Sequence, residues 1–150
     1  MVDRIDAALF VGHSRMSPST RLTRQVDAAI QNLICKGCKR FYNGGYGAFD
    51  LLCAERLSEI KKSYPDVESI LVQPYPSRYV DKAVLRLYDQ TLYPGLEDCP
   101  QKFAIIYRNR WMVEQSDAAV AYVRRDWGGA ARTLEYARRK GLLILQVGEA

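Results

Sequence analysis

The chain has 150 residues, of which 48% are hydrophobic and 26% are charged, as in ordinary globular proteins. Its net charge of +5 includes no run of five or six like charges, which excludes a basic tail. No apolar run reaches the roughly 18 residues that span a bilayer, and the N-terminus lacks the pattern of a signal peptide, so we expect a cytoplasmic protein with no membrane partner.

The first half of the chain alternates short apolar runs with amphipathic segments. Residues 5–11 are mostly apolar and end at Gly12, which favours a buried strand. Apolar residues then recur at helical spacing as far as Gly37, a common kind of helix stop. The predicted elements are a strand at 5–11, a helix from the capping residues 17–20 to about Gly37, a strand at 40–42, a helix at 48–63 and a strand at 69–73.

The second half continues the alternation around one irregular stretch. Residues 91–100 contain two prolines and a glycine, which predicts a loop. The run Phe103-Ala-Ile-Ile-Tyr107 is apolar and short, which favours a fourth strand. The predicted elements are a helix at 78–88, the loop at 91–100, a strand at 103–107, a short helix at 108–114, a strand at 117–123, a helix at 130–139 and a strand at 142–147.

Nearly continuous apolar strands that alternate with amphipathic helices predict a parallel sheet covered on both faces. We therefore expect an α/β fold, a three-layer Rossmann-like sandwich with a mostly parallel sheet. The length favours a single domain over residues 1–150. In such sheets, ligands bind at the carboxyl ends of the strands, near the point where the strand order reverses.

Glycines, arginines and the single histidine gather at the predicted strand ends. The turn Gly44-Gly45-Tyr46-Gly47 follows one strand, and Gly128-Gly129 precedes a helix, so both can offer backbone N–H groups to phosphate. Arginines can pair with phosphate oxygens, and Tyr46, Tyr75 or Trp127 can stack on a base. We predict ligand contacts from Gly12, His13, Ser14, Arg15, Gly44, Gly45, Tyr46, Gly47, Asp50, Arg108, Asn109, Arg110, Trp127, Gly128, Gly129, Ala130 and Thr133.

Structural interpretations of the same residues stay open. Glycine pairs at strand–helix junctions can be turn residues alone, and Asp50 can stabilise a helix N-terminus instead of binding a ribose hydroxyl. Neither G-x-G-x-x-G with a following acidic residue nor G-x-x-x-x-G-K-[ST] occurs, so the standard dinucleotide and Walker motifs are missing. Cys35-x-x-Cys38 lacks the second ligand pair of a zinc site. We expect no metal and no cofactor.

Four motifs in this order resemble those of the SLOG superfamily, named for Smf/DprA and LOG proteins. The motifs are Gly12-His-Ser-Arg15, Asn43-Gly-Gly-Tyr-Gly-Ala-Phe-Asp50 with the following Leu-Leu-Cys-Ala54, Tyr107-Arg-Asn-Arg110 through Ser116-Asp117, and Gly128-Gly through Ala137. Within that superfamily the chain is most similar to the small stand-alone YspA-like proteins of bacteria or phages. The resemblance implies a Rossmann-like fold that binds a nucleotide-derived ligand at the two glycine turns, and it leads us to expect a homodimer.

The resemblance implies three functions, in order of preference. The first is a sensor or sequestering protein in nucleotide signalling, for an ADP-ribose-like, NAD-derived or nucleoside monophosphate-like ligand. The second is LOG-like phosphoribohydrolase activity on nucleoside 5′-monophosphates, with Glu135 or Asp50 as the catalytic carboxylate. LOG enzymes use the pattern P-G-G-x-G-T-x-x-E, where this chain has Trp127 at the proline, no third glycine, and Thr133 one residue late. The third, least favoured, is binding of single-stranded nucleic acid, in keeping with an isoelectric point near 9.1.

Overall fold

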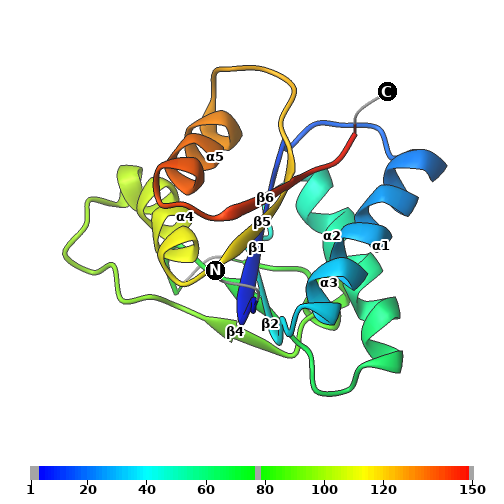
Figure 1. Ribbon diagram of the computed structural model, residues 1–150. Helices are drawn as coiled ribbons and strands as arrows, with labels where there is room; N and C mark the ends of the chain where they lie inside the picture. Colours follow the sequence, from blue (N-terminus) through cyan, green and yellow to red (C-terminus); the bar gives the residue numbers. More distant parts are fainter. Residues whose placement is uncertain (1–3, 77–78, 149–150) are drawn as a thin grey trace.

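The computed structural model describes residues 4–76 and 79–148 and has three layers (Figure 1). The strands are β1 (Ala7–Gly12), β2 (Arg40–Asn43), β3 (Glu68–Val72), β4 (Gln90–Leu92), β5 (Ala118–Tyr122) and β6 (Leu143–Gln146). The α-helices are α1 (Thr20–Cys35), α2 (Ala48–Ile60), α3 (Lys82–Leu85), α4 (Ala104–Glu114) and α5 (Gly129–Arg139). Two 3₁₀ turns, η1 (Lys61–Ser63) and η2 (Gln101–Phe103), precede β3 and α4.

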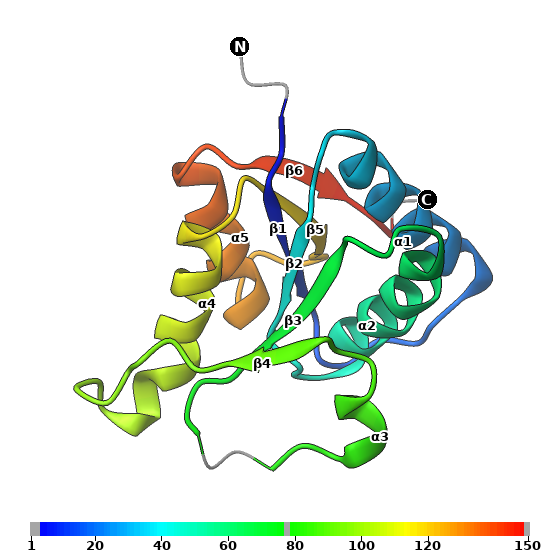
Figure 2. The same cartoon turned by 90° about the horizontal axis from the view of Figure 1, so that it is seen from below.

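In the described part of the chain, the strands form one six-stranded sheet in the order β4-β3-β2-β1-β5-β6, and each neighbouring pair is parallel. Helices α1 and α2 cover one face, and α4 and α5 cover the other (Figures 1 and 2). The chain moves outward from β1 to β4 and then returns to the other side of β1 with β5. The strand order therefore reverses between β1 and β5, which confirms the Rossmann-like α/β fold.

Strand alternation divides the core into two halves. Ala8 and Phe10 of β1 pack in a cluster with the apolar sides of α1 and α2, whereas Leu9 and Val11 pack in a second cluster with Met112 of α4 and other residues. Successive side chains of a strand point to opposite faces, so a fully apolar strand serves both clusters. This explains why the runs at 5–11, 69–73 and 117–123 show no polar alternation.

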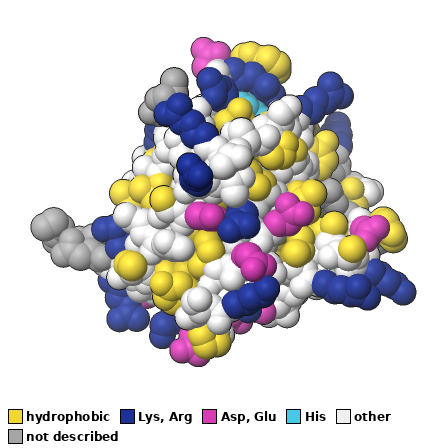
Figure 3. Space-filling view, turned by 90° about the vertical axis from the view of Figure 1, so that its right-hand side faces the viewer, with side chains coloured by type: hydrophobic (Ala, Val, Ile, Leu, Met, Phe, Trp, Pro, Cys, Tyr) yellow, Lys and Arg dark blue, Asp and Glu magenta, His cyan; other side chains and the backbone are white. Residues whose placement is uncertain are grey.

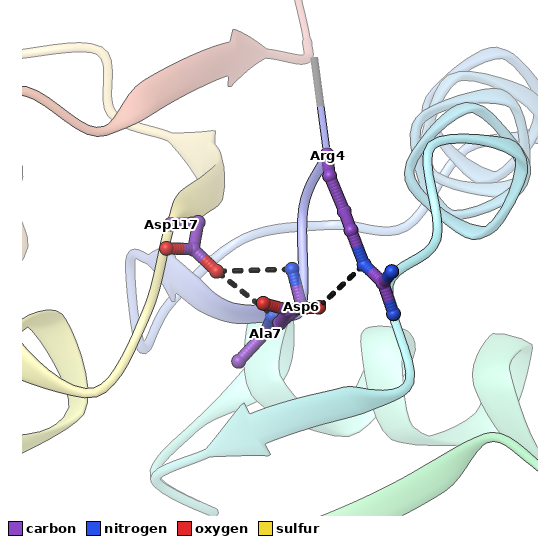
Figure 4. Close-up of polar contacts among 4 residues, drawn as sticks. All are labelled: Arg4, Asp6, Ala7 and Asp117. Atoms are coloured by element: carbon purple, nitrogen blue, oxygen red, sulfur yellow. Dashed lines mark hydrogen bonds and ion pairs between the residues drawn. The ribbon is translucent and has the colours of Figure 1, made fainter. Parts of the chain in front are cut away.

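A carboxylate joins the amino ends of the two central strands, β1 and β5. Asp117 Oδ2 accepts hydrogen bonds from the backbone N–H groups of Asp6 and Ala7 at 3.0 and 3.2 Å (Figure 4). Asp6 also pairs with Arg4, with 3.0 Å between Asp6 Oδ1 and Arg4 Nε. These contacts fix the start of β1 against β5. They lie at the amino ends of the strands, opposite the carboxyl ends at which ligands bind in this fold class.

The predicted strand at 103–107 is wrong, because these residues form η2 and the first turn of α4. Ile105, Ile106 and Tyr107 are partly exposed, and the inward positions Ala104, Arg108 and Met112 recur every four residues. A short apolar run does not distinguish a strand from a helix, and here the four-residue spacing of inward residues determines the structure.

The fourth strand is instead β4, inside the region predicted as helix and loop. It has three residues and lies at the sheet edge, so it carries little of the apolar pattern of a buried strand. The helix predicted at 78–88 is reduced to the single turn α3, capped by Asp81, whose carboxylate accepts from the Ala83 N–H at 2.7 Å. The predicted start of that helix, Arg78, lies outside the described residues. Within residues 4–76 and 79–148, no helix is long and apolar enough to cross a membrane.

Candidate functional site

A cleft of about 170 Å³ lies at the carboxyl ends of β1 and β2, beside the reversal of the strand order. It collects residues from the β1–α1 loop, the β2–α2 turn, helix α4, the β5–α5 loop and the start of α5. The lining residues are Phe10, Val11, Gly12, His13, Ser14, Gly44, Tyr46, Asp50, Ile105, Arg108, Asn109, Met112, Arg125, Gly129, Ala130 and Thr133. We call this space the inner cleft.

Two glycines let the β1 and β2 loops approach each other. A Cβ on Gly12 would overlap the ring of Phe49, and a Cβ on Gly47 would overlap Ser14. Gly47 also has a φ of +95°, a conformation that residues with a side chain rarely adopt. The Ser14 carbonyl accepts from the Ala48 N–H at 2.8 Å, so the start of α2 is bound to the β1–α1 loop. These glycines shape the wall of the inner cleft.

The β2–α2 turn is held by its own side chains. Buried Asn43 accepts from the Gly45 N–H at 2.7 Å through Oδ1 and donates from Nδ2 to the Asp50 carbonyl at 2.8 Å. The Asp50 carboxylate accepts from the Tyr46 N–H at 2.9 Å. The N–H groups of Gly45 and Tyr46 are therefore engaged within the protein. Sequence reasoning did not select Asn43, although an Asn directly before a glycine pair at a strand end is a recognisable turn signal.

His13 is buried in the wall of the inner cleft as a neutral imidazole. Its Nε2 accepts from the Arg124 N–H at 2.9 Å, so the ring proton lies on Nδ1. Burial, followed by the nearby charges of Arg125 and Arg124, lowers the pKa of His13 below its ordinary value. Among the residues that the structure describes, Nδ1 has no hydrogen-bond partner although it is buried. An N–H donor in this state favours a ligand acceptor.

The sequence pattern had placed Arg108 at the end of a strand. In the structure, Arg108 reaches the inner cleft from helix α4. The residue is 2% exposed, and its Nη1 donates to the carbonyls of Gly44 and Val72, each at 2.9 Å. Its Nε donates to Asn109 Oδ1 at 2.8 Å. Arg108 therefore links α4 to the ends of β2 and β3, and much of its donor capacity serves the fold.

The start of α5 is the open part of the inner cleft. Gly128 precedes the helix with a φ of +94°, and a Cβ added to Gly129 would meet no atom of the described residues within 4 Å. The first N–H groups of a helix have no partner in the preceding turn and carry the positive end of the helix dipole. Arg125, a lining residue that the sequence prediction omitted, lies next to this helix start with its guanidinium carbon 4.1 Å from the centroid of the Trp127 ring.

A second space of about 380 Å³ lies between α4 and α5. Its lining residues are Ile105, Ile106, Asn109, Arg110, Asp126, Gly129, Ala131, Arg132, Thr133, Glu135, Tyr136 and Arg139. We call it the outer groove. Ile105, Asn109, Gly129 and Thr133 line both spaces, so they share a wall.

The predicted site residues divide between these spaces. Eleven of them line the inner cleft, and three of these, Asn109, Gly129 and Thr133, also line the outer groove. The eleven are Gly12, His13, Ser14, Gly44, Tyr46, Asp50, Arg108, Asn109, Gly129, Ala130 and Thr133. Arg110 and Glu135 line the outer groove, and Arg15, Gly45, Gly47, Trp127 and Gly128 line neither. The two candidate catalytic carboxylates are thus separated, since Asp50 is buried in the inner cleft whereas Glu135 is exposed and 3.9 Å from Arg139.

No group of three or more His, Cys, Asp or Glu side chains in the described part of the chain is arranged to hold a metal ion. Cys38 is buried, and its Sγ donates to the Arg40 carbonyl at 3.4 Å. Burial raises the pKa of this thiol to about 12, which is opposite to the shift of a metal-binding or redox cysteine. Cys38 is therefore part of the core, whereas Cys35 is exposed.

Comparison with protein-family models finds no match, and comparison with curated proteins finds none. Solved structures do match. DNA processing protein A from Helicobacter pylori, whose structure describes single-stranded DNA binding, has a TM-score of 0.70 at 16% identity over 99% of this chain and 68% of that one. DNA processing protein A from Streptococcus pneumoniae gives 0.66 at 18% identity, over 99% of this chain and 52% of that one.

A third similar structure is the molybdenum cofactor carrier protein from Chlamydomonas reinhardtii, with a TM-score of 0.62 at 15% identity over 95% of this chain and 76% of that one. At these identities the similarity concerns the fold alone. These structures share the Rossmann-like fold that the resemblance implied, and that fold is confirmed, whereas membership of the SLOG superfamily stays a prediction.

Proposed function

We propose that this protein binds a nucleotide or a nucleotide-derived small molecule, with a phosphate group in the inner cleft at the start of α5. The observation that carries the proposal is the convergence there of three kinds of donor. These are the first N–H groups of α5 at Gly129 and Ala130, the guanidinium of Arg125, and the buried, unpartnered Nδ1 of His13. Phosphate combines the negative charge and the multiple acceptors that such a set of donors favours.

The opposite wall of the inner cleft supports a sugar next to that phosphate. Asp50 has one carboxylate oxygen on the Tyr46 N–H, and a carboxylate can accept several hydrogen bonds. Ribose hydroxyls are donors that suit it. The cleft thus has one acidic side chain, Asp50, on one wall and the positive start of α5 with Arg125 on the other. This combination favours a ligand with both a sugar and a phosphate over one made of phosphates alone. We propose that the protein acts as a sensor or sequestering protein of the YspA-like type, that residues 1–150 form one domain, and that it forms a homodimer.

The test is a thermal-shift assay combined with chromatography of the products. Nucleoside monophosphates, NAD and ADP-ribose are each added to the purified protein, and both the melting temperature and any released base are followed. We expect stabilisation without product, and a binding loss of about tenfold in Arg125→Ala, the size of one charge-assisted hydrogen bond. Arg138→Ala is the matched control, because Arg138 lies near the end of α5 and lines neither the inner cleft nor the outer groove. No stabilisation by any compound would overturn the proposal.

Phosphoribohydrolase activity is the second candidate, and the buried carboxylate of Asp50 in the inner cleft is the observation that favours it. A carboxylate beside the sugar can stabilise an oxocarbenium-like transition state. In the same assay, this activity would release free base from a nucleoside monophosphate. Asp50→Asn would then abolish the release, whereas loss in Glu135→Gln alone would assign the reaction to the outer groove.

Binding of single-stranded nucleic acid is the third candidate, and the local charge of one segment favours it. Residues 124–140 contain six Lys and Arg and two Asp and Glu, which gives +4 of the chain's net +5. By contrast, Lys and Arg on the face that carries α1 and α2 are interspersed with acidic and apolar side chains (Figure 3), which does not favour this candidate. Fluorescence anisotropy with a labelled single-stranded oligonucleotide tests this candidate, for which binding must weaken steeply with salt.

A further inference from the structure

We infer that the ligand extends from the inner cleft into the outer groove and places its planar base there, between α4 and α5. This inference rests on the proposed function and specifies which part of the ligand each space holds. Four residues, Ile105, Asn109, Gly129 and Thr133, line both spaces. A phosphate at Gly129 therefore lies directly beside the passage to the outer groove.

The sizes of the two spaces support a ligand that occupies both. The inner cleft, at about 170 Å³, is smaller than the roughly 300 to 1,000 Å³ of most small-molecule sites. It suits a sugar phosphate without its base. The adjoining outer groove provides about 380 Å³ more, which brings the combined space into that range.

The side chains of the outer groove suit the flat face of a base. Ile105 and Ile106 from α4 are each 37% exposed and present aliphatic surface to the outer groove. Tyr136 from α5 lines the same groove, and its hydroxyl donates to Glu114 at 2.6 Å. Arg110, Arg139 and Lys140 lie over this ring, 5.5, 5.9 and 5.3 Å from its centroid, so the ring supports cationic side chains at the groove. Aliphatic side chains and a planar guanidinium both pack against the flat face of a heterocycle, and the isoleucines and Arg110 supply these surfaces.

Asn109 supplies a directed polar contact at the passage. Its Oδ1 accepts from Arg108 Nε at 2.8 Å, and since that partner is a donor, the amide orientation is determined. Nδ2 is consequently the group that Asn109 can offer to a ligand. It is a donor, so it matches a carbonyl oxygen or an unprotonated ring nitrogen of a base. The inference therefore differs from the sequence expectation that Tyr46, Tyr75 or Trp127 stacks on the base.

Calorimetric titration with ribose 5-phosphate and with each of the four nucleoside 5′-monophosphates tests the inference. We expect at least one monophosphate to bind about tenfold more tightly than ribose 5-phosphate. In Ile106→Asn, this preference falls about fivefold while binding of ribose 5-phosphate is unchanged, because Ile106 lines the outer groove alone. Leu51→Asn is the matched control, an aliphatic residue of α2 with 39% exposure that lines neither space.

The outcomes separate this inference from the function on which it rests. If ribose 5-phosphate binds but every monophosphate binds equally well, the inference is overturned and the phosphate site stands. The same holds if Ile106→Asn weakens both kinds of ligand equally or leaves the preference intact. If neither ribose 5-phosphate nor any monophosphate binds, this inference is overturned, whereas the proposed function falls only if NAD and ADP-ribose do not bind either.

Discussion

The imidazole of His13 and the backbone of Arg124 are joined by a hydrogen bond in which Nε2 accepts from N–H at 2.9 Å. This bond connects the loop after β1 with the loop after β5, the two strands between which the sheet order reverses. Protonation of Nε2 would abolish the acceptor and place a third positive charge beside Arg124 and Arg125. The contact therefore couples the shape of the inner cleft to the charge state of a single ring.

His13 gives the protein a stability that depends on pH. Because the folded-state pKa of His13 is lowered, the unfolded state binds the proton more readily. The stabilisation is fully present above the ordinary value of 6.5 and decreases as the pH falls below it. Urea unfolding from pH 7.5 to pH 5 should show this decrease in the wild type and a smaller one in His13→Gln, whose amide oxygen can still accept from Arg124. Equal decreases in both proteins would contradict the assignment.

Removal of the Arg108 side chain should strongly destabilise the protein. Arg108→Ala leaves the carbonyls of Gly44 and Val72 without their donor and opens a cavity below the β2–α2 turn. We expect a loss of about 3 kcal/mol in the free energy of unfolding, measured by urea denaturation. Arg110→Ala, two residues further along α4 and at its surface, should cost less than about 1 kcal/mol. A similar loss in both variants would mean that the buried bonds of Arg108 contribute little.

Asp117 offers a change that should affect stability and spare ligand binding. In Asp117→Ala the N–H groups of Asp6 and Ala7 lose their acceptor at the amino ends of β1 and β5. Asp117 is largely exposed, so water replaces part of the interaction, and we expect a loss of about 1 kcal/mol in the free energy of unfolding. The affinity of the variant for any ligand found for the wild type should be unchanged. A changed affinity at constant stability would contradict our conclusion that Asp117, at the amino ends of the strands, is separate from the candidate site at their carboxyl ends.

Thiol chemistry should distinguish the four cysteines. Cys35 is exposed, whereas Cys38 and Cys53 are buried and their pKa values are raised, that of Cys38 to about 12. At pH 8 a thiol reagent such as DTNB should react rapidly with Cys35 and leave Cys38 and Cys53 unmodified until the protein unfolds. Cys35→Ser should remove one equivalent of the rapid reaction, since Cys99 is partly exposed and can react as well, and Cys38→Ser should leave the rapid reaction unchanged. Rapid modification of Cys38 in the native protein would contradict its burial.

The predictions from sequence succeeded where burial and periodicity agree. The strand predicted at 5–11 is β1 (Ala7–Gly12), between two helix layers. The helix predicted to end near Gly37 is α1 (Thr20–Cys35), which has apolar residues inward and is capped by Ser19, whose hydroxyl accepts from the Leu22 N–H at 3.0 Å. Residues 103–107 misled because exposed isoleucines on a helix imitate a buried strand. The apolar run carries no signal that Ile105 and Ile106 are partly exposed, and the structure places both in the wall of the outer groove.

The candidate site shows a similar division. Because parallel strands bring their carboxyl ends to the same side of the sheet, the sequence predicted that Gly12, His13 and Gly129 lie close together. In the structure all three line the inner cleft. The same reasoning gave Arg108 a place at a strand end, whereas the residue reaches the inner cleft from a helix. It did not select Arg125, which lines the inner cleft beside the start of α5, or Asn43, whose side-chain hydrogen bonds hold the β2–α2 turn. Such bonds follow from three-dimensional positions that spacing along the chain does not encode.

The bonds of Arg108 also bear on the order in which the protein assembles. Its guanidinium binds carbonyls 64 and 36 residues earlier in the chain, at Gly44 and Val72. Neither bond can form until α4 has docked on a sheet that already contains β2 and β3. During synthesis, the ribosome must therefore release α4 before the floor of the inner cleft is complete. The candidate site is thus completed late in folding, only in chains whose second half has joined the first.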